Sequence, residues 1–146
     1  MTTGERSDPY LDFRFHVELS GLIVGGFSEV DGLEVELETE EYQEGGVNRY
    51  SHTLPVRHSY SNLTLRRGLT DSSELWDWMR RTMFGAPELR SGRIILLNNY
   101  GEEVRGWGFR DGYPVRWEGP DLSADQGSVA MESLEIAHHG LEQLSI

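Results

Sequence analysis

Residues 34–42 read EVELETEEY, a stretch in which charged and uncharged side chains alternate. The glutamates of one register are Glu34, Glu36, Glu38 and Glu40. Strict alternation is typical of a β-strand with one face in water and one face packed, so Val35 and Leu37 are expected to pack into the subunit. Carboxylates on the same face of a strand lie about 7 Å apart and repel by roughly 0.6 kcal/mol in bulk water. The stripe therefore requires hydration, either on an ordinary outer surface or along the wall of a water-filled channel.

The length and composition of the chain narrow the class of protein. Its 146 residues suit a single domain, residues 1–146, with its own core. No run of about 18 apolar residues occurs, and residues 1–10 lack the apolar segment of a secretory signal, so we expect no membrane anchor. The net charge of −12 argues against direct nucleic-acid binding, because phosphate contacts need clustered basic residues. Cysteine is absent, which excludes disulfides and thiolate metal sites.

The basic residues are unusual in kind. All 13 are arginine, and lysine does not occur. A GC-rich genome that favours arginine codons explains this composition. So does a salt-loving source, in which acidic, lysine-poor surfaces keep proteins soluble. Both explanations stay open, and neither bears on the fold.

Period-two alternation, interrupted by glycine-rich turns, predicts a protein built mainly from strands. The expected strands are residues 11–19, 27–30, 33–42, 62–66, 93–98, 103–109, 113–117 and 128–138. We expect turns at 98–101 and 111–112, and a long loop at 43–60, a connection of a length that is usually functional. The unbroken run IILL at 94–97 predicts a strand covered on both faces. The expected fold class is mainly β, a small β-barrel or sandwich of two antiparallel sheets with one flanking α-helix.

One helix is expected, at residues 72–84. Asp71 and Glu74 have the spacing of a capping box, and an apolar stripe at helical spacing follows them. The stripe consists of Leu75, Trp78, Met79, Thr82 and Met83. Trp76 lies off the stripe. Either a second face of the helix meets a partner, or this tryptophan is simply half-exposed.

Motifs for catalysis and for cofactor binding are missing. The chain has no G-x-S-x-G, no H-E-x-x-H and no phosphate-binding glycine loop. His138 and His139 are neighbours in an expected strand, so their side chains point to opposite faces and do not share a metal. A flat row of carboxylates lacks the cage of oxygens that holds a divalent cation. We therefore expect no catalytic residue, no metal and no cofactor, and the chain does not read as an enzyme.

An ordered set of short motifs resembles the tail-tube proteins of contractile injection machines. The motifs are DPY at 8–10, FRF at 13–15, GFSEV at 26–30, GL at 32–33, YQEGGVN at 42–48, LP at 54–55, NLTLRRG at 62–68, LWDW at 75–78, YPVRW at 113–117, GPDL at 119–122 and ESLEIAH at 132–138. Each motif is weak alone, but together they span about residues 8–140 in the expected order. Arg66 and Arg116 stand where lysine is expected, a difference that keeps the charge.

The resemblance implies a structural subunit of the inner tube of a contractile phage tail, a tailocin or an extracellular injection system. Proteins of this family form hexameric rings that stack into a hollow tube, which contraction of a surrounding sheath drives into a target. The secreted tube protein of type VI secretion shares their barrel-plus-helix fold. The implied partners are further copies of the chain, the sheath protein, baseplate and spike proteins, a tube terminator, and a tape-measure protein or cargo in the lumen. Assembly is expected in the cytoplasm, followed by incorporation into a phage tail or a released extracellular particle.

A ring built from this chain gives three expectations for its surfaces. Glu34, Glu36, Glu38 and Glu40 are expected to line the lumen, unless they form ordinary outer charge. The residues expected to stack one ring on the next are Glu44, Gly45, Gly46, Asn48, Tyr50, Leu54 and Pro55, with residues 1–10 as a secondary contributor. Trp76 and Trp78 are expected at the contact between neighbours within a ring. For the long loop, a mobile surface segment is the alternative.

Two other functions stay open at this point. A baseplate protein that initiates the tube has the same fold, although such proteins usually carry insertions that this chain lacks. A solitary β-barrel binding module with an acidic ligand face belongs to a different functional class. The three differ in self-association, because they predict long hollow fibres, isolated rings and monomers respectively.

Overall fold

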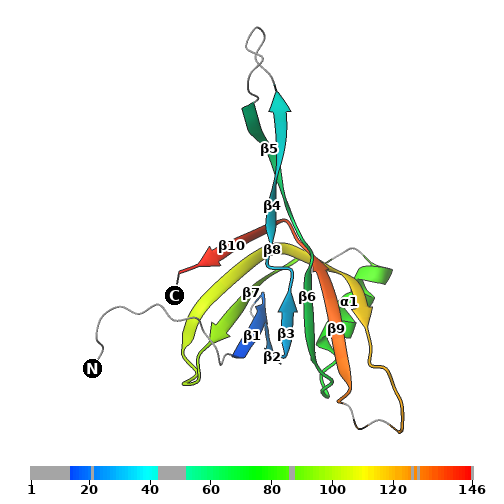
Figure 1. The fold of residues 1–146 in the computed structure, drawn as a ribbon. Coiled ribbons are helices and arrows are strands. Elements are labelled where there is room, and N and C mark those ends of the chain that lie inside the picture. Colours follow the sequence, from blue (N-terminus) through cyan, green and yellow to red (C-terminus); the bar gives the residue numbers. More distant parts are fainter. Residues whose placement is uncertain are drawn as a thin grey trace, which may run out of the picture.

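A computed structural model describes residues 14–20, 22–42, 52–85, 88–125, 127 and 129–145. Along the chain its elements are β1 (Arg14–Leu19), β2 (Leu22–Phe27), β3 (Glu29–Asp31), β4 (Val35–Tyr42), β5 (His52–Tyr60), β6 (Leu63–Gly68), α1 (Glu74–Phe84), β7 (Arg90–Leu97), β8 (Glu103–Glu118), β9 (Met131–Ala137) and β10 (Gly140–Leu144). The described chain is mainly β with one helix on its flank (Figure 1), which confirms the expected fold class.

The body is an antiparallel sheet with two halves that share β8. The first half of β8 pairs with β7 and β10, and its second half pairs with β9. Neighbouring strands follow the order β2-β1-β7-β8-β9-β6-β3, with β10 also beside β8. One long strand therefore carries the chain from one half of the sheet to the other. Strands β4 and β5 form a separate two-stranded sheet.

Strand β8 is continuous, so the turn expected in its middle is wrong. Asp111 adopts a left-handed φ of 53°, which Asp tolerates better than most residues. Gly112 nevertheless pairs with Arg90 of β7, so the strand bends here instead of reversing. A Cβ on Gly112 would lie 2.8 Å from the Phe109 ring and 3.0 Å from the Ile136 side chain. The bend needs glycine because core side chains already fill that space.

Residues 52–60 form β5, so the long loop expected at 43–60 is wrong over its second half. Strand β5 pairs antiparallel with β4 along its length. Its sequence pattern is obscured because Pro55 interrupts it and because the register shifts at Val56, the extra residue of a β-bulge. Residues 43–51, the rest of the expected loop, lie outside the described residues.

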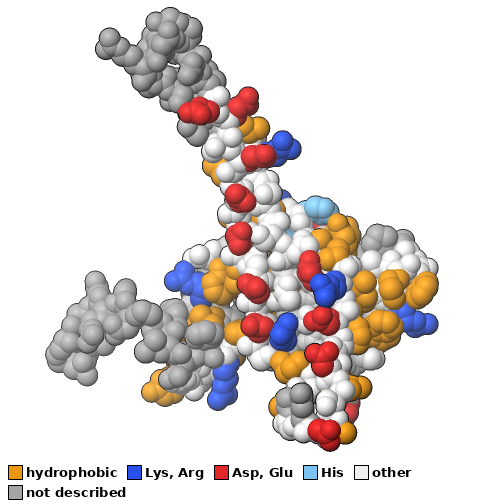
Figure 2. Space-filling model, turned by 45° about the vertical axis from the view of Figure 1, so that its right-hand side comes forward, with side chains coloured by type: hydrophobic (Ala, Val, Ile, Leu, Met, Phe, Trp, Pro, Cys, Tyr) orange, Lys and Arg blue, Asp and Glu red, His pale blue; other side chains and the backbone are white. Residues whose placement is uncertain are grey.

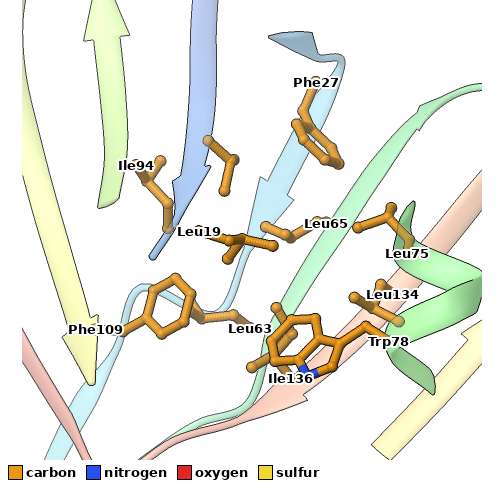
Figure 3. Close-up of a cluster of buried hydrophobic side chains, with 11 residues drawn as sticks. Leu19, Phe27, Leu63, Leu65, Leu75, Trp78, Ile94, Phe109, Leu134 and Ile136 are labelled. Atoms are coloured by element: carbon orange, nitrogen blue, oxygen red, sulfur yellow. The ribbon is translucent and has the colours of Figure 1, made fainter. Parts of the chain in front are cut away.

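The core lies between the two halves of the sheet and beneath α1 (Figure 3). Its buried side chains are Val17, Leu19, Phe27, Leu63, Leu65, Leu75, Trp78, Ile94, Phe109, Leu134 and Ile136. Ile94 and Ile95 are both buried, although successive residues of a strand point to opposite faces. This confirms the expectation that the IILL strand is covered on both sides.

Helix α1 begins at Glu74, with Ser73 as its N-cap residue. The expected capping box is wrong, because Asp71 lies before the cap and Ser73 Oγ instead donates a hydrogen bond to Asp77 Oδ2 at 2.9 Å. Glu74 and Asp77 place negative charge in the first turn, where it suits the positive end of the helix dipole. Trp78 Nε1 donates a hydrogen bond to the Glu88 carbonyl oxygen at 2.8 Å, which fixes the helix to the segment that leads into β7.

A buried ion pair joins β6 to β9. Arg67 and Glu132 are only 4% and 3% exposed, and Arg67 Nε lies 2.8 Å from Glu132 Oε1. Trp117 of β8 donates a hydrogen bond from Nε1 to the other carboxylate oxygen at 3.1 Å. The Arg67 guanidinium also lies over the Phe27 ring, 5.5 Å from its centroid. Glu132 of β9 therefore links its own strand to β6 through Arg67 and to β8 through Trp117.

We predict that Glu132→Ala destabilises the fold by about 3–5 kcal/mol, because it removes the carboxylate from a buried cation. Urea unfolding followed by circular dichroism measures this change. Glu118→Ala is the control, since Glu118 pairs with Arg116 at 3.1 Å on the exposed surface, where such pairs contribute about 0–1 kcal/mol. Equal losses in the two variants contradict a structural role for the buried pair.

Candidate functional site

Strands β4 and β5, here called the arm, project from the body as an isolated hairpin (Figure 1). Directly opposite residues of an antiparallel pair lie on the same face. Glu36 pairs with Ser59 and Glu38 with Arg57, which defines an acidic face. The apolar face has two further pairs, Val35 with Tyr60 and Leu37 with His58. The sequence alternation is thus preserved in the structure.

Both faces of the arm are exposed in a single chain. Val35 and Leu37 are 57% and 56% exposed, so the expectation that they pack into their own subunit is wrong. The reason is that the arm stands clear of the body, with no second layer behind it (Figure 1). Val56 on β5 is also more than half exposed. The arm therefore presents apolar side chains that no described residue of its own chain covers.

The acidic face forms a continuous row of carboxylates along the arm, which is visible in Figure 2. Residues 34–41 are all exposed, so the four expected lumen glutamates are hydrated in the single chain. Among these four, only Glu38 forms an ion pair with a described residue, Arg57, at 2.5 Å, and both side chains are more than half exposed. An exposed pair contributes little to stability. The row thus remains a strip of concentrated negative charge.

The base of the arm is attached to the body through His138. Its Nε2 lies 3.1 Å from the Ser61 carbonyl oxygen, just beyond β5, and its Nδ1 lies 3.0 Å from the Gly140 carbonyl oxygen. The imidazole is buried, with Tyr60 and Phe109 at ring-centroid distances of 5.4 and 6.0 Å. These contacts join the end of the arm to β8 and to the corner between β9 and β10.

His138 and His139 lie in that corner and not within one strand, so the expected strand at 128–138 is wrong at its end. At this corner His138 is buried and His139 is exposed. The sequence analysis ended its last strand at residue 138 and expected no strand at Gly140–Leu144, which forms β10. Among the described residues, no three His, Asp or Glu side chains come together in a metal-binding group.

Most of the residues expected to stack rings fall where the structure gives no description. Glu44, Gly45, Gly46, Asn48 and Tyr50 lie outside the described residues. The other two belong to β5, where Leu54 pairs with Glu40 and Pro55 pairs with Thr39. Pro55 is exposed. The last two residues are therefore on the arm, and the first five belong to the segment that connects its strands.

The two tryptophans of α1 differ in environment. Trp76 is 39% exposed, and its ring lies 5.0 Å from that of Trp117 in an edge-to-face arrangement. Trp78 is only 2% exposed and belongs to the core, so its expected place at a contact between subunits is wrong. Burial explains this outcome, because Trp78 lies on the apolar stripe that faces the sheet.

A second exposed surface on α1 was missed by the sequence analysis. Met83, expected on the buried stripe, is about half exposed, and Phe84 is 81% exposed. Trp76, Arg80, Met83 and Phe84 have the i, i+4, i+7, i+8 spacing of one helix face; this set is called the outer face of α1. That spacing, with two large apolar residues on it, is the signal that could have revealed the surface.

Beside the base of the arm, the surface of the described residues has a depression. This depression has a volume of about 270 Å³ and is lined by Tyr60, Gly108, Phe109, Arg110, Gly140, Leu141 and Glu142. No helix within the described part of the chain is long and apolar enough to span a membrane. The arm and the outer face of α1 are therefore the two surfaces whose chemistry calls for an explanation.

Comparison with known proteins gives consistent results. The sequence profile of the T4-like virus tail tube protein gp19 matches residues 11–142. A chain in the sheath–tube complex of the extracellular contractile injection system PVC, in its extended state, has a TM-score of 0.84 and 24% identity over 94% of this chain and 93% of its own. A chain in the six-fold symmetrised anti-feeding prophage baseplate has a TM-score of 0.77 and 25% identity over 95% and 97%.

Hcp1 from Flavobacterium johnsoniae is more distant, with a TM-score of 0.64 and 14% identity over 89% of this chain and 94% of its own. No curated protein sequence matches the chain significantly.

We predict that His138→Phe lowers the free energy of unfolding by about 1–3 kcal/mol, because it removes the hydrogen-bonding partner of the Ser61 carbonyl oxygen and of the Gly140 backbone. The phenyl ring keeps the aromatic contacts with Tyr60 and Phe109, so the hydrogen bonds are tested separately from packing. His139→Phe is the matched control at the exposed neighbouring position. Urea unfolding checks both variants, and an unchanged His138→Phe stability shows that the attachment is unimportant.

Proposed function

We propose the function of this chain from one premise: it belongs to the T4-like virus tail tube protein gp19 family, whose profile covers residues 11–142. It is a structural tail tube protein, with the fold of the tube proteins of contractile injection systems and of Hcp. We propose that its copies form hexameric rings, that the rings stack into a hollow tube, and that sheath contraction drives this tube into a target. No enzymatic activity is required for this work.

The unpartnered arm is the observation that carries the proposal. A two-stranded sheet alone in water is at best marginally stable, and this one exposes Val35, Leu37 and Val56 as well. Contact with another copy covers these side chains. A cyclic, head-to-tail arrangement lets every copy supply an arm and receive one, and ring closure limits growth in that direction. The chain is therefore built to be completed by its neighbours.

We place the acidic face of the arm toward the lumen. Glu34, Glu36, Glu38 and Glu40 are hydrated in the single chain, and a water-filled bore keeps them so. A negative wall repels nucleic acid and acidic cargo, so transit through the tube meets little adhesion. The opposite, apolar face of the arm is then directed toward protein.

We assign ring stacking to the connection between β4 and β5, with Leu54 and Pro55 on the arm as its neighbours. The residues proposed in that connection are Glu44, Gly45, Gly46, Asn48 and Tyr50, and residues 1–10 contribute secondarily. The support is their position, since they connect the ends of two strands that project away from the body (Figure 1). We also propose that Trp76 contacts the neighbouring copy within a ring, because its side chain is partly exposed on α1.

The proposed partners besides other copies are the sheath protein, baseplate and spike proteins, a tube terminator, and a tape-measure protein or cargo in the lumen. Support comes from the relatives, one of which stands in a sheath–tube complex and another in a baseplate. We propose assembly in the cytoplasm and a final place in a phage tail, a tailocin or a released injection particle.

A tube-initiating protein of the baseplate is the second candidate, because a baseplate chain has a similar fold at 25% identity. Negative-stain electron microscopy of the purified protein separates the functions. We predict long hollow fibres with six-fold symmetric cross-sections. Isolated rings at every concentration favour the initiator, and monomers at every concentration contradict both and favour a solitary binding module.

We predict that replacing Glu36 and Glu38 together with glutamine leaves tube formation intact, because a lumen position involves these side chains in no packing contact. Tube yield by sedimentation and tube diameter by electron microscopy measure the result. Glu132→Gln is the contrasting control, since this carboxylate is buried in the body. Complete loss of assembly in the double arm variant, with the monomer still folded, refutes the lumen position.

A further inference from the structure

The outer face of α1 is a second surface without a described partner. Phe84 is 81% exposed and Met83 about half exposed, in line with Trp76 and Arg80. A depression of about 570 Å³ beside them is lined by Arg80, Arg81, Phe84 and Gly85. On the flank of the body where α1 lies, Figure 2 shows hydrophobic side chains beside cationic ones. Large exposed apolar residues gathered in this way mark an interaction surface.

The charge of this surface limits what binds to it. The whole chain has a net charge of −12, yet two arginines stand together at the depression. Arg81 is held by Glu88, with Nε and Oε2 3.0 Å apart. Within the described residues, Arg80 has no ion pair. An occupant of matching chemistry is apolar on the side that meets Phe84 and carries carboxylates nearby.

The arm has this chemistry. Its apolar face exposes Val35 and Leu37, and the glutamate row lies along its other face. The negative charge of the glutamate row attracts the arginines of α1 over several ångströms and steers the approach. Burial of the apolar side chains supplies the affinity. The arm of one chain points away from its own α1, as Figure 1 shows, so the two surfaces meet only between copies.

We propose that the outer face of α1 receives the apolar face of the arm of a second copy. This inference rests on the proposed tube function and specifies its subunit contact. It places Val35 and Leu37 of one copy against Met83 and Phe84 of the next, with Arg80 beside the acidic edge of the incoming arm. Each copy donates one surface and accepts the other, as a head-to-tail contact requires.

Cross-linking tests the contact directly, because the natural chain contains no cysteine and gives no background. Protein carrying Leu37→Cys is mixed with protein carrying Phe84→Cys, assembled, and treated with a short bismaleimide linker. We expect a covalent dimer that contains one copy of each variant. Glu38→Cys replaces Leu37→Cys in the matched control, since it lies on the other face of the arm. Equal yields from both mixtures, or no cross-link in assembled protein, overturn the proposal.

A second pair of variants covers the case in which the cysteine variants do not assemble. Phe84→Ser is compared with Leu122→Ser, because these side chains are similarly exposed, at 81% and 84%. Both variants are expected to keep the wild-type melting temperature. Phe84→Ser is expected to raise the concentration needed for assembly about tenfold or more, as loss of one buried aromatic anchor does. Leu122→Ser is expected to leave it unchanged.

The outcomes separate this contact from the function on which it rests. Wild-type protein that forms tubes, with Phe84→Ser assembling equally well, overturns the α1 contact and leaves the tube function standing. Wild-type protein that stays monomeric at every concentration overturns both. Phe84→Ser that fails to assemble while Leu122→Ser assembles normally supports the contact.

Discussion

A two-stranded sheet with solvent on both faces has little stability of its own, so the arm depends on the contacts that support it. Its own body holds it at one end, where His138 approaches the Ser61 carbonyl oxygen and its ring lies tilted against that of Tyr60. Beyond that point, Val35 and Leu37 remain exposed. The body, by contrast, has a closed core and a buried ion pair. The chain thus combines a body that has its own core with an arm whose exposed apolar side chains we propose are covered by another copy.

The sequence predicted those features that local patterns determine. Alternation placed the acidic strand, because each glutamate of the row is separated by one residue from the next. The apolar run at 94–97 predicted a strand buried on both sides, and Ile94 and Ile95 are so buried. Helical spacing located α1. The ordered motifs indicated the tail-tube family, which the match over residues 11–142 confirms.

The sequence patterns did not predict the features that depend on tertiary structure. Asp111 and Gly112 are typical turn residues, yet the strand does not reverse there: the register with β7 shifts before Gly112, which again pairs with Arg90. Strand β5 was taken for loop, because its bulge breaks the alternation on which recognition depends. Alternation also assigned Leu37 to a packed face, because a sequence pattern does not show whether a second layer covers that face. For the candidate site, sequence supplied the glutamates but not the exposure of Phe84, since helical spacing does not say which face meets the sheet.

Amide hydrogen exchange tests most directly whether the arm needs a second copy. Exchange is compared between dilute monomer and assembled protein, with the amides of β6 and β9 as internal references from the body. The predicted result is rapid exchange in β4 and β5 of the monomer and strong protection of the same amides after assembly, with the body protected in both states. An arm that is as well protected in the monomer as in the assembly contradicts the claim.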